Sequence, residues 1–475
     1  MTKNHAKAVF YLCPPRKSQR EKLAFFRILL LYEEMKTAFL LSVLSFALFP
    51  FALCGQEEKP STSPPINSPP QTATLEDLPT APPGVWPIAR LQSEIPKFQI
   101  EDESAPIQSL LYSGEPVNGK ATEVFAFYAS PKTIGTASGE GPFPGIVLIH
   151  GGGGTAFSDW VLLWAKRGYA AIAMDLSGHR PPAPKFDEKG EKISDHGHRP
   201  DERTKLENGG LDQGHPQKFD SIGGTVSDDW PYHAVANVMK AHTLLRSFPG
   251  VDPERTAVTG ISWGGYTTCL VASLDDRFKA AVPVYGCGFL HEGESVQKPS
   301  IDALGDRREA WIAAYDPSSH LAKCTVPTLW VNGTNDIHYV LDSYAKSYSL
   351  VKGPKTFRIE PMMSHGHPSG WAPKEIGIFV DSLINNGVPL PSIGEMIVHA
   401  DTVVVPFTSK TRVTKAELFY TTSTGIRSKR EWNSISARIE DGKAIAERLP
   451  PEANTWLMTF TDERGAMVTS AVRMR

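Results

Sequence analysis

Cysteine is scarce in this chain of 475 residues, which contains only five. Two of them, Cys13 and Cys54, lie before or within an apolar segment near the N-terminus. The other three can form at most one intramolecular disulfide, and their spacing matches no zinc-binding pattern. We therefore expect Cys269, Cys287 and Cys324 to be small apolar side chains of the core.

The sequence also lacks an excess of charge, a long basic run and internal repeats. Lysine and arginine total 49 against 52 aspartate and glutamate residues, which gives a formal net charge of -3. A nearly balanced charge argues against nucleic acid as the main partner. The absence of a repeat argues against a solenoid or a propeller. Hydrophobic residues make up 41% of the chain, enough for a large core in two or three domains.

An apolar run near the N-terminus indicates export. Met35 and Lys36 are followed by a compact apolar segment through residue 53, which is the pattern of a secretory signal peptide. We expect residues 1–55 to be an N-terminal extension and signal peptide with translation starting at Met35, and the protein to be secreted or periplasmic without a stable membrane span. The alternative is a membrane anchor formed by residues 36–53. Residues 56–84 are rich in Pro, Ser and Thr and predict a disordered linker.

Residues 85–390 alternate between apolar strands and amphipathic helices. The expected strands lie near 123–128, 145–150, 170–175, 256–258, 279–285, 328–332 and 356–360. This alternation predicts an α/β fold with a mostly parallel sheet and helices on both faces. A long polar loop, 177–228, interrupts the pattern and predicts a functional or disordered segment. Residues 391–475 change to a period of two and predict a small C-terminal β-sandwich domain.

The strongest catalytic pattern lies around Ser262. The sequence from Thr259 to Gly265 is Thr-Gly-Ile-Ser-Trp-Gly-Gly, between an apolar strand and a helix. Strand, Gly-x-Ser-x-Gly and helix is the arrangement of a nucleophile elbow, although the motif alone also fits a plain glycine-rich turn. We expect side chains two residues before and after the serine to clash with neighbouring backbone. The amide of Trp263, at the helix N-terminus, is a candidate donor to an oxyanion.

A serine nucleophile needs a base and an acid that orients the base. Asp336 follows a predicted strand and is the preferred acid. Its alternative role is a helix cap, and Asp175 is the second candidate acid. His365 and His367 follow the last predicted strand of the sheet; His365 is the preferred base and His367 the alternative. The chain order of serine, aspartate and histidine is that of α/β-hydrolases.

A glycine run supplies the last element of the predicted site, a second donor to an oxyanion. His150 ends a predicted strand and precedes four glycines, of which Gly151 and Gly152 are candidate second donors to an oxyanion. The matching pieces, in chain order, are His150–Gly154, Gly260–Gly265, Gly333–Asp336 and Ser364–His367. On these pieces, residues 120–388 resemble an α/β-hydrolase of the dienelactone hydrolase, acetyl xylan esterase and prolyl oligopeptidase group. The stretch Phe125–Pro131 is also similar to secreted bacterial acetyl xylan esterases.

The resemblance implies hydrolysis of esters or peptides through an acyl-enzyme, which needs no cofactor. We expect a secreted serine esterase that acts on a small-molecule or polysaccharide ester. The alternative is a serine peptidase of the prolyl oligopeptidase group, which is less favoured because no propeller precedes the hydrolase. A non-catalytic carbohydrate-binding or cell-surface protein is the third interpretation, and the complete serine, histidine and aspartate set argues against it.

Two further features have structural interpretations. Asp316, which precedes Pro317, is expected to cap a helix. Histidines and aspartates gather in and near the long loop, but their spacing matches no metal-binding motif, so we expect a polar lid near the substrate and no metal. This group consists of His179, Asp195, His196, His198, Asp212, His215, Asp228, Asp229 and His233.

Overall fold

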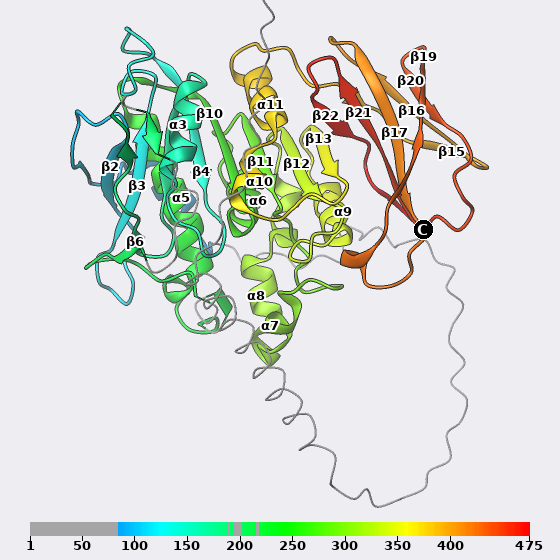
Figure 1. The fold of residues 1–475 in the computed structure, drawn as a ribbon. Coiled ribbons are helices and arrows are strands. Elements are labelled where there is room, and N and C mark those ends of the chain that lie inside the picture. Colours follow the sequence, from blue (N-terminus) through cyan, green and yellow to red (C-terminus); the bar gives the residue numbers. More distant parts are fainter. Residues whose placement is uncertain (1–83, 189–190, 194–201, 215–217, 220) are drawn as a thin grey trace, which may run out of the picture. The chain divides into compact units, whose positions relative to one another are not determined.

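A large mixed sheet forms the centre of the computed structural model, which describes residues 84–188, 191–193, 202–214, 218–219 and 221–475 (Figure 1). The predicted signal peptide and most of the predicted linker lie outside these residues. Among the described residues, no helix combines the length and the apolar character needed to cross a membrane.

The part of this sheet formed by residues 85–390 has a parallel centre. Its strands are β1 (Phe98–Ile100), β2 (Gln108–Ser113), β3 (Glu123–Ala129), β4 (Phe143–Ile149), β5 (Ala170–Met174), β10 (Val251–Ile261), β11 (Ala280–Val284), β12 (Thr328–Gly333) and β13 (Lys355–Glu360). They lie in the order β1-β2-β3-β5-β4-β10-β11-β12-β13. From β5 to β13 all neighbours are parallel, whereas β1, β2 and β3 pair antiparallel. The apolar runs of β4, β5 and β11 are buried along almost their whole length, because both faces of the sheet are covered.

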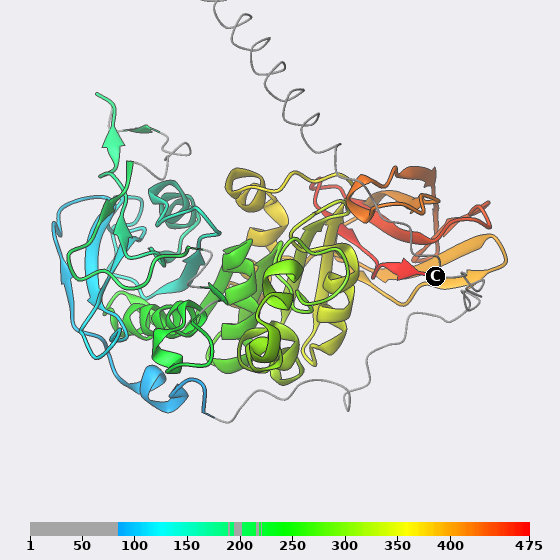
Figure 2. The same ribbon diagram turned by 90° about the horizontal axis from the view of Figure 1, so that it is seen from below.

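Helices cover both faces of the parallel strands (Figure 2). The helices are α2 (Ile88–Ser93), α3 (Ser158–Lys166), α5 (Trp230–Ser247), α6 (Trp263–Leu274), α7 (Lys298–Asp302), α8 (Arg308–Tyr315), α9 (Leu341–Leu350), α10 (His367–Trp371) and α11 (Lys374–Ile384). Helix α5 packs against β4, β5, β10 and its neighbour α6. On α11, Gly377 lies against the guanidinium of Arg167, which directly follows α3. The predicted α/β fold with helices on both faces is confirmed.

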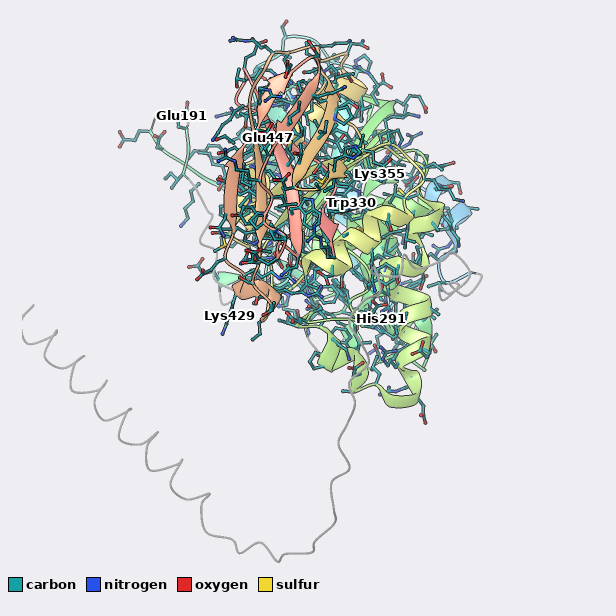
Figure 3. The ribbon with its side chains drawn as sticks, turned by 90° about the vertical axis from the view of Figure 1, so that its right-hand side faces the viewer. Glu191, His291, Trp330, Lys355, Lys429 and Glu447 are labelled. Carbon is teal, nitrogen blue, oxygen red and sulfur yellow. The ribbon has the colours of Figure 1, made fainter. Side chains whose placement is uncertain are left out.

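Large aromatic side chains fill the space between sheet and helices. Trp330 of β12, labelled in Figure 3, is fully buried, with its ring 5.2 Å from Tyr344 and 6.1 Å from Tyr348 of α9. The three described cysteines, Cys269, Cys287 and Cys324, are buried and unbridged, as the sequence predicts.

The polar stretch 177–228 forms short ladders where the structure describes it. Strand β6 (His179–Arg180) pairs with β9 (Thr204–Lys205), and β7 (Lys185–Phe186) pairs with β8 (Lys192–Ile193). A short 3-10 helix, η2 (Val226–Asp228), precedes α5. The stretch therefore has local secondary structure that its composition does not predict.

The C-terminal residues build a β-sandwich. Its strands are β14 (Ser392–Ile393), β15 (Ile397–His399), β16 (Thr402–Thr408), β17 (Val413–Thr421), β18 (Asn433–Ser436), β19 (Arg438–Glu440), β20 (Lys443–Ala446), β21 (Thr455–Asp462), β22 (Met467–Thr469) and β23 (Arg473–Met474). One layer contains β14, β15, β16, β19 and β20; the other contains β17, β18, β21, β22 and β23. The rings of Phe407 and Phe460 meet between the layers at 5.5 Å. The predicted small C-terminal β-sandwich is confirmed.

One layer of this sandwich continues the central sheet of residues 85–390. Strand β22 pairs antiparallel with β13 through Phe357 and Thr469. On the adjacent helix, Glu375 accepts a hydrogen bond from the amide of Met467 at 2.6 Å and forms an ion pair with Arg358 at 3.0 Å. We propose that residues 391–475 are nonetheless a separate domain, because the other layer consists wholly of strands that follow residue 391.

Candidate active site

Ser262 lies at a sharp turn between β10 and α6. Its backbone has φ 59° and ψ -118°, a conformation that L-residues rarely adopt and that stores strain. A Cβ at Gly260 would lie 2.2 Å from the carbonyl oxygen of Gly264, and one at Gly264 would lie 2.0 Å from that of Ile149. Only glycine fits either position, so the predicted clash at both flanking positions is confirmed. The turn lies at the carboxyl end of the parallel strands, where α/β sheets place their ligands.

Three polar side chains connect across this end of the sheet. His365, in the loop after β13, has its Nε2 3.0 Å from the Ser262 hydroxyl and its Nδ1 2.6 Å from a carboxylate oxygen of Asp336. Because a carboxylate only accepts hydrogen bonds, Nδ1 carries the proton and Nε2 can accept one from the serine. The other oxygen of Asp336 accepts the amides of His338 and Tyr339, each at 2.8 Å. The Asp336 side chain is fully buried, whereas 25% of the His365 side chain is exposed.

Aromatic rings hold His365 in this position. Tyr285 lies 4.5 Å from the His365 ring between centroids, and His338 lies 4.7 Å from it. The Tyr285 hydroxyl donates a hydrogen bond to the backbone oxygen of Ser364 at 2.7 Å, which anchors the loop one residue before the histidine. Burial, and then the neighbouring His365, lower the pKa of His338 below its usual range.

The second candidate base, His367, faces the glycine run. Its Nε2 accepts a hydrogen bond from the amide of Gly151 at 2.9 Å, and its ring lies 4.7 Å from that of Phe157. Burial, followed by the nearby His150 and His365, lowers the pKa of His367 to about 3. The ring is therefore neutral near pH 7, and its accepting nitrogen is already occupied.

The candidate oxyanion donors differ in their partners. The amide of Gly151 is bonded to His367, whereas the amides of Gly152 and Trp263 make no hydrogen bond within the described part of the chain. Gly152 lies against the Trp263 indole, since a Cβ there would meet that ring at 3.0 Å. His150 fixes the start of the run: its Nε2 accepts the amide of Leu176 at 2.9 Å, and its Nδ1 donates to the Gly151 oxygen at 2.8 Å.

The second candidate acid lies in a different network. Asp175 is buried and accepts hydrogen bonds from Thr155, Ser177 and the amide of His179. Asp195, His196, His198 and His215 of the histidine and aspartate group lie outside the described residues. Within the described ranges, no set of three or more His, Cys, Asp or Glu side chains could hold a metal ion.

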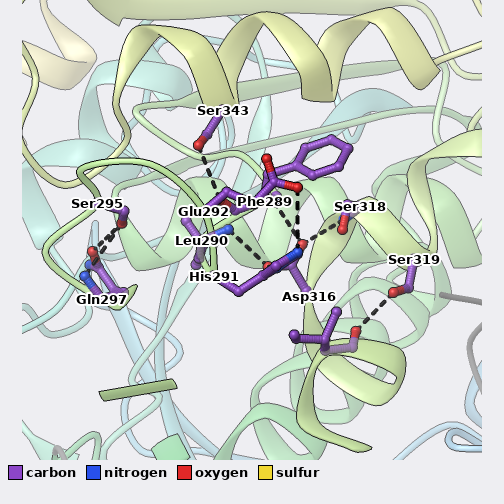
Figure 4. Close-up of polar contacts among 12 residues, drawn as sticks. Phe289, Leu290, His291, Glu292, Ser295, Gln297, Asp316, Ser318, Ser319 and Ser343 are labelled. Atoms are coloured by element: carbon purple, nitrogen blue, oxygen red, sulfur yellow. Dashed lines mark hydrogen bonds and ion pairs between the residues drawn. The ribbon is translucent and has the colours of Figure 1, made fainter. Parts of the chain in front are cut away.

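Asp316 is a structural carboxylate. It accepts the amide of Ser318 at 2.9 Å as the predicted helix cap, at the start of a short 3-10 helix that begins with Pro317. It also accepts the amides of Phe289 and Leu290, at 2.8 and 3.0 Å, from the loop after β11 (Figure 4). These contacts fix the loop that follows Tyr285.

Three side chains near the site have no signal in the sequence. Tyr339 lies behind His365, with parallel rings 6.4 Å apart. The Lys218 ammonium lies 4.9 Å from the ring centroid of Trp263, and burial lowers its pKa to about 8. Arg203 donates a hydrogen bond to the backbone oxygen of Gly154 at 2.5 Å. The stretch 177–228 thus contacts the glycine run and the elbow through single charged residues that no motif marks.

Comparison with known proteins finds a family match over part of the chain. Residues 213–377, which include Ser262, Asp336 and both histidines, match the prolyl oligopeptidase family. The uncharacterized peptidase YuxL of Bacillus subtilis (strain 168) is 25% identical over 256 residues, which are 48% of this chain and 33% of that protein. The aligned region thus spans about a third of the length of that relative.

Solved structures with a similar arrangement include esterases and peptidases. The acetyl xylan esterase from Paenibacillus sp. R4 is 20% identical, with a TM-score of 0.46, covering 62% of this chain and 91% of that one. An acylaminoacyl peptidase from Pyrococcus horikoshii is 17% identical, with a TM-score of 0.39, covering 59% of this chain and 39% of that one. Similarity at this level identifies no substrate.

Proposed function

We propose that this chain, an α/β-hydrolase of the dienelactone hydrolase, acetyl xylan esterase and prolyl oligopeptidase group, is a serine hydrolase that cleaves carboxylic esters through an acyl-enzyme. The observation that carries the proposal is the continuous line of hydrogen bonds from Ser262 through His365 to Asp336. A hydroxyl, an imidazole that can accept its proton and a buried carboxylate are the groups that nucleophilic acyl transfer requires.

Each residue of this line has a defined role. Ser262 Oγ attacks the acyl carbon while His365 Nε2 takes its proton, and the same nitrogen later protonates the leaving alcohol. Asp336 keeps the proton of the imidazole on Nδ1 and stabilises the imidazolium. Water then attacks the acyl carbon with His365 as base, which releases the acid and restores the serine.

The amides of Trp263 and Gly152 are the proposed donors to the oxyanion. Trp263 directly follows Ser262, Gly152 lies against the Trp263 ring, and neither amide has a competing hydrogen bond among the described groups. The Gly151 amide, the other candidate from the sequence, is less suitable because it already donates to His367. Backbone amides that are fixed before the reaction stabilise the developing charge without reorganisation.

The resemblance of Phe125–Pro131 to acetyl xylan esterases favours an acetyl ester of a small molecule or polysaccharide. The match to the prolyl oligopeptidase family favours a peptidase as the second candidate function. Turnover of p-nitrophenyl acetate, of acetylated xylan and of a prolyl p-nitroanilide peptide separates the two. We expect release of p-nitrophenol and acetate from the two esters. Cleavage of the anilide alone would make the peptidase the favoured function.

Replacing the nucleophile tests the proposal directly. Ser262→Ala should remove nearly all esterase turnover, because a comparable change costs on the order of 10⁶ in a well-studied serine protease. A fluorophosphonate probe should label the parent at Ser262 and leave the variant unlabelled. Ser273→Ala, at the far end of the same helix, is the matched control and should keep its activity. Variant activity within about tenfold of the parent would contradict the assignment.

We also propose that the protein is exported. The support is the apolar run at residues 36–53 after a short charged start. N-terminal sequencing of protein from the native host should give a first residue near Gly55 or Gln56. A chain that retains residues 36–53 would favour the membrane anchor.

A further inference from the structure

One buried hydroxyl beside the candidate active site has no partner. The side chain of Tyr339 is 0% exposed, and its oxygen makes no hydrogen bond to any group that the structure describes. Burying a hydroxyl without a hydrogen bond is costly, so such groups are rare in folded proteins. An unsatisfied group of this kind next to reacting atoms points to a partner that appears only during the reaction.

The position of Tyr339 is firmly fixed. Its amide donates to Asp336 at 2.8 Å, and its carbonyl oxygen accepts the side-chain amide of Asn332 at 2.8 Å. Its ring lies parallel to that of His365, with an interplanar angle of 8° and 6.4 Å between centroids. The backbone of Tyr339 is therefore tied to the acid of the site, and its ring lies beside the base.

The hydroxyl of Tyr339 adjoins that of Ser262. Burial raises the pKa of Tyr339 well above its usual range, and an interaction with the Ser262 side chain acts in the opposite direction. The geometry agrees, because the Tyr339 ring lies parallel to that of His365, whose Nε2 is 3.0 Å from Ser262 Oγ; in the resting structure the Tyr339 hydroxyl makes no hydrogen bond among the described groups. Tyr339 therefore keeps its proton near pH 7, so it can act as a hydrogen-bond donor.

We propose that the Tyr339 hydroxyl donates a hydrogen bond to Ser262 Oγ while negative charge develops on that oxygen. This inference rests on the proposed serine hydrolase function. During attack, the serine proton moves to His365 Nε2, a lone pair of Oγ forms the bond to the acyl carbon, and the tyrosine proton stays on its own oxygen. When the acyl-enzyme breaks down, the bond between Oγ and the acyl carbon breaks, Oγ takes a proton from His365 Nε2, and the same donor stabilises the partial charge on Oγ as it leaves.

A donor that is unpaired in the resting enzyme and paired in the transition state lowers the barrier without tightening substrate binding. Tyr339→Phe should therefore lower kcat and kcat/KM together, by about ten- to a hundredfold, the range for a hydrogen bond to a charged group, with KM unchanged. Labelling of Ser262 by a fluorophosphonate should slow by a similar factor. The melting temperature should stay the same or rise, because the variant removes a buried group that has no partner.

Tyr344 provides a matched control. It is also 0% exposed, but its hydroxyl donates to the backbone oxygens of Pro283 and Val331, at 3.0 and 2.8 Å. Tyr344→Phe should lower the melting temperature and leave kcat within twofold of the parent. The two variants remove the same atom from two buried rings, so opposite effects on stability and turnover separate a chemical role from a packing role.

The outcomes distinguish this proposal from the function on which it rests. If Ser262→Ala is inactive and Tyr339→Phe keeps both its kcat and its labelling rate within twofold of the parent, the role of Tyr339 is refuted and the serine mechanism stands. If Ser262→Ala keeps its turnover although the probe no longer labels it, both the serine mechanism and the role of Tyr339 are refuted. Loss of kcat together with a lower melting temperature in Tyr339→Phe would also count against it, since that pattern reports packing.

Discussion

Acidification should destabilise this protein at pH values where its carboxylates are still charged, and His320 allows the effect to be measured. The histidine is 2% exposed, and its Nε2 donates to the backbone oxygen of Ala314 at 2.9 Å. Its Nδ1 has no partner among the described groups, and its ring lies 5.6 Å from that of Trp86. Burial lowers the pKa of His320 to about 4.

The magnitude follows from the difference between the folded and unfolded states. A histidine in the unfolded chain has a pKa of about 6.5, so the unfolded state binds this proton first as the pH falls. The neutral ring therefore makes its full contribution to the free energy of unfolding above about pH 6.5. Below that pH the contribution decreases by about 1.4 kcal/mol per pH unit until about pH 4. Between about pH 7 and about pH 5 the loss is about 2 kcal/mol.

Urea unfolding of the parent and of His320→Gln at both pH values measures this loss. The side-chain amide of glutamine can still donate to Ala314, so the variant keeps the hydrogen bond and removes the titration. Any fixed cost of the substitution cancels in the comparison. The unfolding free energy of the parent should fall by about 2 kcal/mol more than that of the variant between about pH 7 and about pH 5. Equal losses in the two proteins would refute the argument.

Two further predictions concern the site and the core. His365→Ala should lose activity to nearly the extent of the nucleophile variant, whereas His367→Gln should keep most of it, because the glutamine oxygen can accept the Gly151 amide; the opposite order of losses in turnover assays would overturn the assignment. Arg277→Met should lower the unfolding free energy by about 3 kcal/mol, because the fully buried carboxylate of Asp275 loses its 2.7 Å ion pair and keeps the 2.8 Å hydrogen bond with His242. A loss below about 1 kcal/mol in denaturant titration would contradict this.

The parts of the site that could be predicted are those with local constraints. The glycines on either side of Ser262 are required by backbone contacts within a few residues, so the motif itself reports the turn. Asp336 and His365 each follow a buried strand directly, and parallel strands bring their carboxyl ends together. The periodicity of the apolar runs was sufficient for the strands from β3 to β13 of the central sheet, but not for β1 and β2, which no expected strand covers.

Other features depend on pairs that are distant in the chain. The bond between Gly151 and His367 spans 216 positions, and the contact between Lys218 and Trp263 has no motif. Strand β22 is only three residues long, so neither its existence nor its partner β13 could be predicted from a pattern. Strand β10 extends back through Asp252 and Arg255, polar residues where its register against β4 shifts, so the apolar run marks only its buried end.

The pairing of β22 with β13 also governs how this chain can be shortened. A sheet that ends in an unpaired strand offers a row of free amides and carbonyls to another molecule, and proteins cover or charge such edges to prevent aggregation. In the intact chain the strands after residue 391 cover the side of the sheet that β13 would otherwise expose. A hydrolase fragment ending near residue 390 would keep Ser262, Asp336 and His365 and lose this cover. Its copies would then meet along β13, and aggregation, rather than loss of chemistry, would limit its use.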